Sequence, residues 1–426
     1  MSDVSPNPES QVSGELWHTQ IPQNVGAPTS KTGWVGVENA AQTANQHVAQ
    51  TILTPNMSGL DTLFSDNPGT RALFRLLDDP DVQDVRANSH NSVFFTDSSG
   101  PRLLHRIFSS PQQYEEFIDG LLALTDVGYK RLADAKTSVV EGSFDTRLTV
   151  LKGSVIVATS DLTRGEPALV VRKQPKTLIT LDEMLEENMM SQDMRLFLEA
   201  AVRGRLNMLI SGSSGAGKTT LARALSWFVD PSQRVLTVEE INELHLVSRL
   251  PNVVSLVTYR DVDEQGRVIR EETLEDLVRH ALRMRADRIW VGETRGKEAY
   301  ALSKACLSGH DGSVTTLHAN NTAQAIEQLV SYTMEAGIPE EVARDQVANA
   351  FHLAIQIKVS TLGRRVITEI VELEPVREGA RQRRNPLWVY DQHSDMFIQQ
   401  GQPSPRLLEA LARYNVNISG YLGYSS

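Results

Sequence analysis

Residues 212–220 read GSSGAGKTT, and this stretch decides the fold of the 426-residue chain. It matches the pattern G-x-x-x-x-G-K-[ST], with the apolar run Leu206–Ile210 before it and a helix-forming segment after it. Glycines let consecutive backbone N–H groups surround a phosphate at the positive end of a helix. The stretch therefore predicts a phosphate-binding loop between a buried strand and a helix, rather than a glycine-rich turn with an incidental lysine.

The side chains at the end of this loop have distinct expected roles. Lys218 brings a positive charge to the β- and γ-phosphates of a nucleotide, and the Thr219 hydroxyl is a ligand for Mg²⁺. We therefore expect ATP and Mg²⁺ as cofactors. The expected nucleotide-binding residues of the loop are Gly212, Ser213, Ser214, Gly215, Ala216, Gly217, Lys218, Thr219 and Thr220.

Strand and helix patterns alternate around this loop. Such alternation predicts a parallel sheet covered by helices on both faces, and hence an α/β domain. The expected strands are Leu206–Ile210, Arg234–Val238, Val253–Thr258, Arg288–Val291 and Ser313–Leu317. The expected helices are Lys218–Val229, Thr273–Arg283, Gly296–Leu307, Thr322–Met334 and Glu340–Phe351, with a protruding hairpin over Asp261–Arg270.

The rest of the chain divides into further expected regions. Residues 1–60 are rich in Pro, Ser, Asn, Gln and Thr, with Lys31 as their only base, which predicts a disordered or partner-binding tail. Residues 61–175 predict a smaller α+β domain, 176–190 a linker, 191–375 the nucleotide-binding domain, and 376–426 a C-terminal hairpin and helix. The elements expected in the α+β domain are helices Leu63–Leu77 and Pro111–Leu124 and strands Val82–Ala87, Val93–Thr96, Phe144–Leu151, Ser154–Thr159 and Leu169–Lys173.

Composition narrows the class of protein. The formal net charge of −11 argues against broad, charge-driven binding of nucleic acid. No apolar run approaches the ~20 residues that span a bilayer, and the N-terminus lacks the pattern of a signal peptide. Cys306 is the single cysteine, which excludes an internal disulfide and fits a reducing compartment. Together these features predict a cytoplasmic protein of several domains.

Carboxylates follow two of the expected strands. Glu293 ends the strand Arg288–Val291, where a carboxylate can orient an attacking water, but Gly292 stands where an aspartate is usual. Glu239, Glu240 and Glu243 follow another strand, at the sheet edge where ligands bind. There a carboxylate can hold Mg²⁺ through water or polarise the nucleophile, and an acidic helix start is the alternative interpretation.

Two histidines, His310 and His318, flank the expected strand Ser313–Leu317. Together with the turn residues Gly309, Asp311 and Gly312 before that strand, they predict a sensor of the γ-phosphate state. A zinc site formed by Cys306, His310 and His318 is the alternative, although the spacing matches no ordinary zinc pattern.

Four segments in this order resemble motifs of the type II and type IV secretion-system ATPases, the motors of pilus assembly, protein export and conjugation. They are GSSGAGKTT, VEEINELHL, LRMRADRIWVGETRG and SGHDGSVTTLHANN, similar to that family's Walker A, aspartate box, Walker B and histidine box. LRMRADRI and GHDGS are most similar to the tight-adherence (Flp) pilus branch. The likeness covers roughly residues 70–420. It departs from the family at Glu240, where the aspartate box usually has Asp.

The resemblance implies a RecA-like P-loop NTPase domain preceded by a smaller α+β N-terminal domain. It also implies a homohexamer that hydrolyses ATP with Mg²⁺ at the cytoplasmic face of the inner membrane, together with membrane platform proteins. Which of Glu239, Glu240 and Glu243 serves the metal stays open. The implied catalytic residues are Lys218, Glu240, Glu243, Glu293, His310, His318 and Arg172. Thr219 and Glu240 are the implied metal ligands, Arg147 is a further nucleotide ligand, and Arg283, Arg285 and Arg295 are weaker candidates.

Two other classes of protein are alternatives. A nucleic-acid-dependent RecA-like motor or strand-binding ATPase needs a basic or aromatic track. The one feature that favours it is a basic cluster, which we interpret as a solvated or membrane-facing patch, so we expect no sequence-specific nucleic-acid binding. A nucleotide-binding scaffold without hydrolysis is the other alternative. The basic cluster comprises Arg377, Arg381, Arg383 and Arg384.

Overall fold

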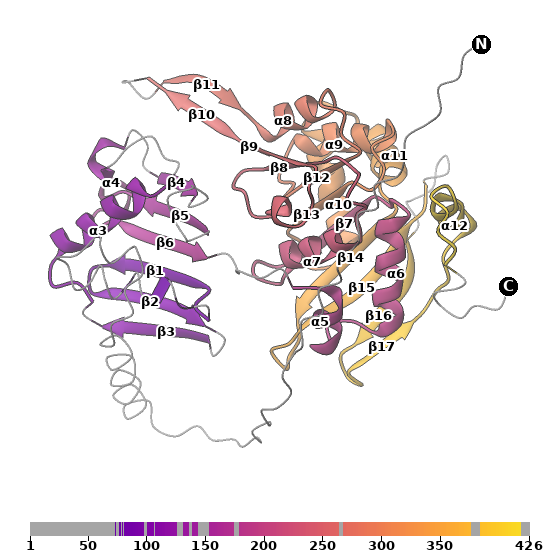
Figure 1. The fold of residues 1–426 in the computed structure, drawn as a ribbon, viewed down its shortest axis with the longest axis horizontal. Coiled ribbons are helices and arrows are strands. Elements are labelled where there is room, and N and C mark those ends of the chain that lie inside the picture. The colour runs from indigo at the N-terminus through magenta and orange to yellow at the C-terminus, as the bar shows by residue number, and fades with distance from the viewer. Residues whose placement is uncertain are drawn as a thin grey trace, which may run out of the picture. The chain divides into compact units, whose positions relative to one another are not determined.

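The computed structural model contains a six-stranded sheet, a nine-stranded sheet and a two-stranded hairpin (Figure 1). It describes residues 73, 76–77, 79, 81–97, 100–105, 107–125, 131–135, 139–143, 153–173, 179–263, 267–375 and 384–418. Four expected segments lie wholly or mostly outside these ranges. They are the tail over 1–60, the strand Phe144–Leu151, most of the helix Leu63–Leu77, and residues 376–383, which hold most of the basic cluster.

The six-stranded sheet is antiparallel, with strand order β3-β2-β1-β6-β5-β4. Helix α3 (Pro111–Ala123) packs its buried face into the core of this sheet, and the Tyr114 hydroxyl donates to the carbonyl of Pro167 at 3.0 Å. Ser110 caps the helix and a proline fills its first turn, as expected for a helix start. The other elements are β1 (Asp84–Ser89), β2 (Ser92–Asp97), β3 (Gly100–His105), β4 (Val139–Ser143), β5 (Gly153–Ala158), α4 (Ser160–Thr163), β6 (Ala168–Lys173) and a 3₁₀ turn, η1 (Leu132–Asp134). The expected smaller α+β fold is confirmed.

The nine-stranded sheet holds the GSSGAGKTT loop. Its order is β17-β16-β15-β14-β7-β13-β12-β8-β9, in which the strands from β14 to β9 run parallel and β15, β16 and β17 extend the sheet in antiparallel fashion. The strands are β7 (Met208–Gly212), β8 (Val235–Glu239), β9 (Val253–Val257), β12 (Arg288–Val291), β13 (Val314–Leu317), β14 (Leu353–Val359), β15 (Arg365–Leu373), β16 (Arg384–Asp391) and β17 (Met396–Gln399).

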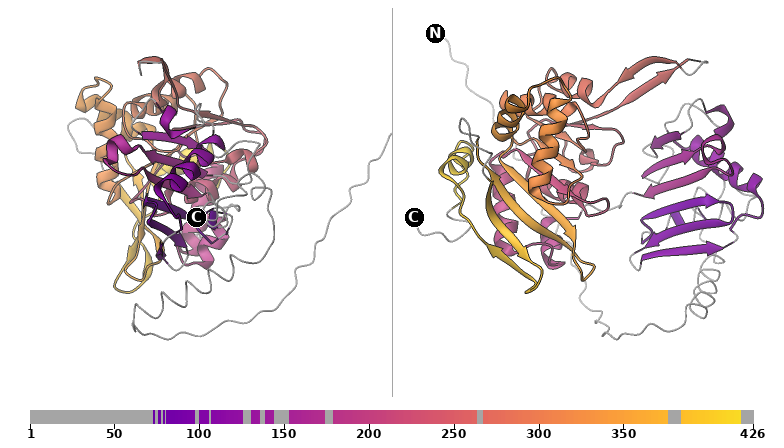
Figure 2. Two further views of the ribbon diagram at one scale, coloured as in Figure 1. Left: turned by 90° about the vertical axis from the view of Figure 1, so that its left-hand side faces the viewer. Right: turned by 180° about the vertical axis from the view of Figure 1, so that it is seen from behind.

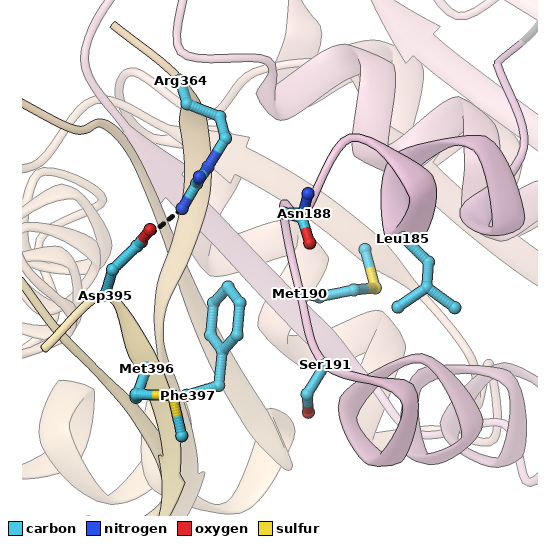
Figure 3. A pocket seen from close by; sticks show the side chains of 8 residues that line it. All are labelled: Leu185, Asn188, Met190, Ser191, Arg364, Asp395, Met396 and Phe397. Atoms are coloured by element: carbon cyan, nitrogen blue, oxygen red, sulfur yellow. Dashed lines mark hydrogen bonds and ion pairs between the residues drawn. The ribbon is translucent and has the colours of Figure 1, made fainter. Parts of the chain in front are cut away.

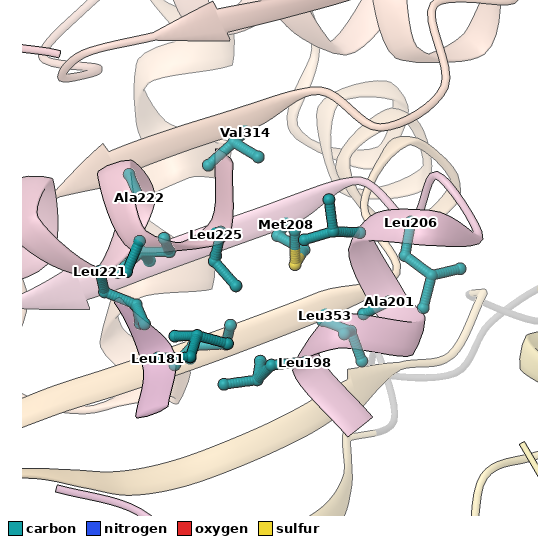
Figure 4. Close-up of a cluster of buried hydrophobic side chains, with 14 of the residues drawn as sticks. Leu181, Leu198, Ala201, Leu206, Met208, Leu221, Ala222, Leu225, Val314 and Leu353 are labelled. Atoms are coloured by element: carbon teal, nitrogen blue, oxygen red, sulfur yellow. The ribbon is translucent and has the colours of Figure 1, made fainter. Parts of the chain in front are cut away.

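Helices cover both faces of this sheet, as the continuous burial of its central strands requires. Along β7, Met208 and Ile210 join one apolar core whereas Leu209 joins the other, so alternate side chains face opposite layers. Figure 4 shows the first core, with Met208, Leu206, Leu221 and Leu353 among the side chains drawn. Its helices are α5 (Leu181–Glu186), α6 (Gln192–Arg203), α7 (Lys218–Leu225) and α12 (Pro405–Ala412).

The second core lies under helices that follow the loop in the chain, and Figure 2 shows them on the opposite side of the sheet. These helices are α8 (Leu274–Ala281), α9 (Glu298–Leu307), α10 (Thr322–Met334) and α11 (Glu340–Ala350). The expected boundaries are close to these, and α10 matches its prediction. The expected α/β domain with both faces covered is confirmed.

Two chain segments differ from their predictions. Residues 181–190 form part of the larger domain rather than a linker, because α5 buries Leu181 and Met184 in the first core behind a Thr180 capping box. The C-terminal hairpin β16–β17 is not separate either. It continues the nine-stranded sheet, and Trp388 packs on Phe197 of α6 with ring centroids 4.9 Å apart.

Strand β7 begins later than the apolar run that predicted it. Leu206 is fully buried, but it belongs to the turn after α6, where its N–H donates to the carbonyl of Ala201 at 2.9 Å. Burial alone therefore could not separate turn from strand. The predicted hairpin is present as β10 (Tyr259–Val262) and β11 (Val268–Glu272), with residues 264–266 outside the described ranges. Among the helices of the described ranges, none is long and apolar enough to cross a membrane.

Candidate active site

The predicted site residues gather at one edge of the nine-stranded sheet because β7, β8, β12 and β13 run parallel. The carboxyl ends of these strands lead into the GSSGAGKTT loop, the acidic stretch after β8, Glu293 and His318 respectively. Ligands of parallel α/β sheets bind outside such an edge. The sequence motifs are thus brought together by strand direction.

Glycines shape the loop between β7 and α7. Gly215 and Gly217 have φ values of +73° and +103°, a region that side chains other than glycine rarely adopt. At Gly212 a Cβ atom would lie 2.5 Å from the carbonyl oxygen of Ile357 in β14, so the strand could not carry a larger residue there. The loop ends at the N-terminus of α7, where free backbone N–H groups favour an anion.

Lys218 is the first residue of α7, and it is held inside the loop. Its Nζ donates to the carbonyl oxygens of Gly212 and Ser213, each at 3.2 Å, and the residue is only 7% exposed. This burial lowers the pKa of the Lys218 ammonium. A phosphate oxygen would be a stronger acceptor for this cation than a neutral carbonyl.

His318 connects Lys218 to Glu293. Its Nδ1 lies 3.2 Å from Nζ of Lys218, and its Nε2 lies 3.0 Å from Oε1 of Glu293. With the ammonium as donor, Nδ1 accepts, which leaves the ring proton on Nε2 on the side of Glu293. The histidine therefore contacts both the phosphate-binding cation and the strand-end carboxylate.

Arg295 connects Glu293 to the acidic stretch after β8. Its guanidinium binds Oε2 of Glu293 and Oε2 of Glu240, each at 2.8 Å. The hydrogen bond with Glu293 raises the pKa of Arg295. Because Glu240 is occupied by this ion pair, it does not lie against Thr219, where a metal ligand was expected.

Glu243 is the acid that lies beside Thr219. The Thr219 hydroxyl donates to Oε2 of Glu243 at 3.4 Å, a long hydrogen bond. Glu239, in contrast, is only 2% exposed and accepts the backbone N–H groups of Glu243 and Leu244 at 3.0 and 2.9 Å. Burial raises the pKa of Glu239 to about 7. Of the three acids left open by the sequence, the geometry favours Glu243 for the metal.

The donor set fits a nucleotide with Mg²⁺. A Cβ atom at Gly215 would meet nothing within 4 Å, so there is open space beside the loop tip. No group of three or more His, Cys, Asp or Glu side chains in the described ranges could hold a metal by itself. Mg²⁺ is commonly held by one or two protein oxygens together with substrate phosphates, and Thr219 with Glu243 supplies such a pair.

The structure does not bring His310 together with the other predicted site residues. It precedes β13, whereas His318 follows it, and the strand carries the two residues to opposite edges of the sheet. Nδ1 of His310 lies 3.3 Å from the carbonyl oxygen of Ala305 at the end of α9. The same separation argues against the alternative zinc site, which needs both histidines. Burial also raises the pKa of the Cys306 thiol to about 12, which disfavours the thiolate that zinc binds.

The predicted arginines differ in their positions. Arg283 and Arg285 lie in the connection that enters β12, at the edge opposite to Glu293, so only Arg295 of that group reaches the site. Arg172 lies on β6 of the six-stranded sheet, paired across the strands with Asp84 and Ser154 and with its side chain exposed. Arg147 lies outside the described ranges.

Arg365 is a functional candidate that the sequence did not indicate. It begins β15, and its Nε donates to the carbonyl of Gly215 at 3.3 Å, at the tip of the phosphate loop. The two residues are 150 positions apart, and no local pattern connects them. Only the pairing of β14 with both β7 and β15 brings them together.

A pocket of about 450 Å³ opens near the turns that follow β14 and β16 (Figure 3). Arg364 pairs with Asp395 on one side, while Leu185, Asn188 and Met190 line the other. None of the predicted site residues lines this pocket. Its position gives no reason to move the candidate site away from the GSSGAGKTT loop.

The chain is similar to known proteins of one family. Residues 140–362 match the family described as type II/IV secretion system protein. The conjugal transfer protein TrbB of Rhizobium radiobacter is 33% identical over 216 residues, which cover 50% of this chain and 62% of TrbB. A putative conjugal transfer protein of Mycobacterium tuberculosis is 30% identical over 327 residues, which cover 75% of this chain and 89% of that protein.

A solved structure, the ATPase DotB of Legionella pneumophila, has a TM-score of 0.50 at 20% identity, covering 71% of this chain and 79% of DotB. At that identity the likeness concerns the fold, and it agrees with an N-terminal domain followed by a RecA-like domain. The family match spans more than half of the chain, and the mycobacterial relative is covered over most of its length. The chain therefore belongs to the type II/IV secretion system protein family.

Proposed function

We propose that this protein is an ATPase that powers a secretion, conjugation or pilus machine. The observation that carries the proposal is the contact of His318 with both Lys218 and Glu293. A phosphate-binding lysine and a strand-end carboxylate joined through one imidazole form an arrangement in which the presence of a γ-phosphate can be transmitted to the group that orients water. A passive nucleotide-binding scaffold would not need that connection.

Nucleotide binding falls to the loop and Lys218. On binding, the ammonium exchanges the carbonyl oxygens of Gly212 and Ser213 for phosphate oxygens, and backbone N–H groups at the start of α7 complete the cradle. Thr219 and Glu243 would hold Mg²⁺ from the side of β8. When bound, the metal neutralises charge on the phosphates. Arg365 lies at the loop tip, where its cation can contact the polyphosphate.

Hydrolysis needs a group that orients the attacking water. Glu293 has that role in our proposal, because it follows the carboxyl end of β12 and contacts His318. Arg295 holds Glu293 in place through its 2.8 Å hydrogen bond. When a phosphate draws Lys218 away from the Nδ1 atom of His318, the imidazole is free to change its contact with Glu293. This sequence of contacts couples phosphate state to side-chain position.

An arginine from the smaller domain completes the proposed mechanism. Arg172 is the last residue but one of β6 and has an exposed side chain, and a guanidinium suits charge that develops on a transferred phosphoryl group. Supply of this group from a second domain would make hydrolysis depend on domain closure. Arg147 has the same proposed role on the basis of its motif alone.

The finer features of the proposal rest on resemblance. We infer a homohexamer that acts with platform proteins at the cytoplasmic face of the inner membrane. The segments LRMRADRI and GHDGS favour the tight-adherence pilus branch. Relatives named for conjugal transfer support a transport machine of this general kind. The basic cluster is the one feature that favours a nucleic-acid motor. Because residues 376–383, which hold most of that cluster, lie outside the described ranges, no structural observation supports this alternative.

The proposal is tested by phosphate release from the purified full-length chain with ATP and Mg²⁺. Lys218→Ala is the matched variant, because it removes the phosphate-binding cation from the start of α7. We expect hydrolysis by the wild type and none above background by the variant, with both proteins folded. Equal rates in the two proteins would refute the site, and no hydrolysis by an ATP-binding wild type would favour a scaffold. Recovery of membrane proteins bound to the tagged chain then tests the transport role.

A further inference from the structure

Glu239 is a buried acid that the mechanism above does not use. It ends β8, and its Oε1 accepts two backbone N–H groups, from Glu243 at 3.0 Å and from Leu244 at 2.9 Å. The side chain thus ties the far end of the acidic stretch back to the strand from which the stretch leaves. Glu243 is the residue in that stretch whose carboxylate lies beside Thr219.

Gly292 on the neighbouring strand makes room for this side chain. Its N–H donates to the carbonyl of Val238 at 2.9 Å, which places residue 292 directly beside the end of β8. A Cβ atom at position 292 would lie 2.8 Å from Cγ and 3.0 Å from Oε1 of Glu239. Contacts this short force a shift in Glu239 or in the strand. The aspartate that usually precedes the strand-end glutamate is absent here, and Glu239 fills the space where that side chain would begin.

We propose that Glu239 is a positioning residue that holds Glu243 beside Thr219, and that Gly292 is required because it leaves space for the Glu239 carboxyl group. The two residues act by fixing the position of the turn that carries Glu243. Glu239 supplies an acceptor at a fixed distance from β8, and the two N–H bonds set where the turn after β8 places Glu243. The activity readout of this inference rests on the proposed ATPase function.

Fold stability alone is the competing explanation, and the chain offers a matched control for it. Glu372 on β15 is also buried, at 1% exposed, and it also accepts a backbone N–H, from Ser404 at 2.9 Å. It ties the start of α12 to the sheet and contacts no residue of the candidate site. A carboxylate that only stabilises the fold should therefore behave like Glu372 when it is shortened.

The variants separate the acceptor from the charge. Glu239→Gln keeps an oxygen acceptor at the same reach but removes the negative charge. Glu239→Asp keeps the charge but withdraws the acceptor by one methylene. Gly292→Ala leaves Glu239 intact but fills the space that its side chain occupies. Gly165→Ala is the control for this variant, because a Cβ atom at Gly165 would meet nothing within 4 Å.

Three measurements on the full-length protein then test the proposal. Hydrogen exchange of the Glu243 and Leu244 amides reports the two N–H bonds directly, without reference to activity. ATP hydrolysis with a Mg²⁺ titration gives kcat, KM for ATP and the Mg²⁺ dependence, and thermal unfolding gives Tm for each variant. Glu372→Asp is carried through all of them.

Expected results follow from the geometry. Glu239→Gln retains slow amide exchange and most of kcat. Glu239→Asp and Gly292→Ala both accelerate exchange at Glu243 and Leu244 and lower kcat about tenfold or more, since misplacement by ~1 Å can cost up to 10²-fold. KM for ATP changes little, because Lys218 and the loop are untouched. Glu372→Asp lowers Tm without a loss of kcat.

Three results would overturn the proposal. In the first, Glu239→Asp and Gly292→Ala keep both amide protection and kcat. In the second, they lose kcat only as far as Glu372→Asp does at an equal loss of Tm. In the third, Glu239→Gln is as defective as Glu239→Asp, which would mean that charge rather than acceptor position matters. If the wild type does not hydrolyse ATP, the proposed function fails, whereas the amide exchange still decides whether Glu239 and Gly292 hold the turn.

Discussion

Lys218 and His318 are 100 residues apart in the chain, yet Nζ of the lysine lies 3.2 Å from Nδ1 of the histidine. The contact exists because β13 is the parallel neighbour of β7, which puts the end of one strand beside the loop after the other. The same imidazole lies 3.0 Å from Glu293. A single ring thereby separates the cation that we propose binds phosphate from the carboxylate that we propose orients water.

Replacement of His318 tests this connection. His318→Ala should lower kcat about tenfold to a hundredfold, because hydrogen bonds to charged groups contribute ~1.5–3 kcal/mol. ATP affinity should change little, since the loop and Lys218 remain. His310→Ala is the matched control, because that histidine lies at the opposite edge of the sheet and should leave kcat unchanged. Equal effects of the two substitutions on kcat and ATP binding would contradict the assignment.

The acidic stretch makes a prediction about metal dependence. Glu243→Gln should raise the Mg²⁺ concentration for half-maximal hydrolysis about tenfold, because a carboxylate beside Thr219 is lost. Glu240→Gln should have the smaller effect on that concentration, since Glu240 pairs with Arg295 instead. Mg²⁺ titrations at saturating ATP measure both. A larger rise in that Mg²⁺ concentration for Glu240→Gln than for Glu243→Gln would mean that Glu240, the residue suggested by the motif, is the metal ligand.

Arg172 carries the proposed link between the two domains. Arg172→Ala should reduce turnover by ~10³ if its guanidinium acts as an arginine finger, and Arg172→Lys should restore little, because a point charge does not replace the planar fork. Arg102→Ala is a suitable control, since Arg102 is another exposed arginine of the same sheet. Thermal unfolding must accompany the rates. A less stable Arg172→Ala protein with normal specific activity would show that the arginine serves only its own domain.

Continuity of the C-terminal hairpin with the larger domain predicts a stability effect. Trp388 is 1% exposed and packs on Phe197, so Trp388→Ala should lower the free energy of unfolding by about 3–5 kcal/mol. Ile398→Ala on the adjacent strand β17 should cost much less, because Ile398 is 44% exposed. Denaturant unfolding compares the two. Unchanged stability of Trp388→Ala would mean that the hairpin is a separate unit.

Much of the larger domain could be predicted from the sequence because its signals are local. Alternation of apolar strands with capped helices located most elements to within a few residues, and the strand–loop–helix context of GSSGAGKTT predicted where the candidate site lies. Helix α5 was missed because it is short and acidic on its exposed side, so its two buried residues gave only a weak pattern. A linker and a short packed helix share that composition.

The differences between the expected and the observed arrangement of the site residues have physical causes of a different kind. His310 and His318 look equivalent on either side of one strand, but the direction of β13 sends them to opposite edges. Glu239, Glu240 and Glu243 lie within five positions, and only their contacts distinguish a buried anchor, an arginine partner and a threonine partner. Arg365 reaches Gly215 through strand pairing that no local pattern encodes.

Glu293→Gln provides the most direct test that this site hydrolyses ATP. The substitution keeps the shape of the side chain and removes the charge that orients water. ATP binding and phosphate release should be measured side by side for the wild type and this variant. The account predicts near wild-type affinity for ATP together with hydrolysis slower by ~10²–10⁴, the usual contribution of a positioned general base. Unchanged hydrolysis, or loss of ATP binding with Glu293→Gln, would contradict it.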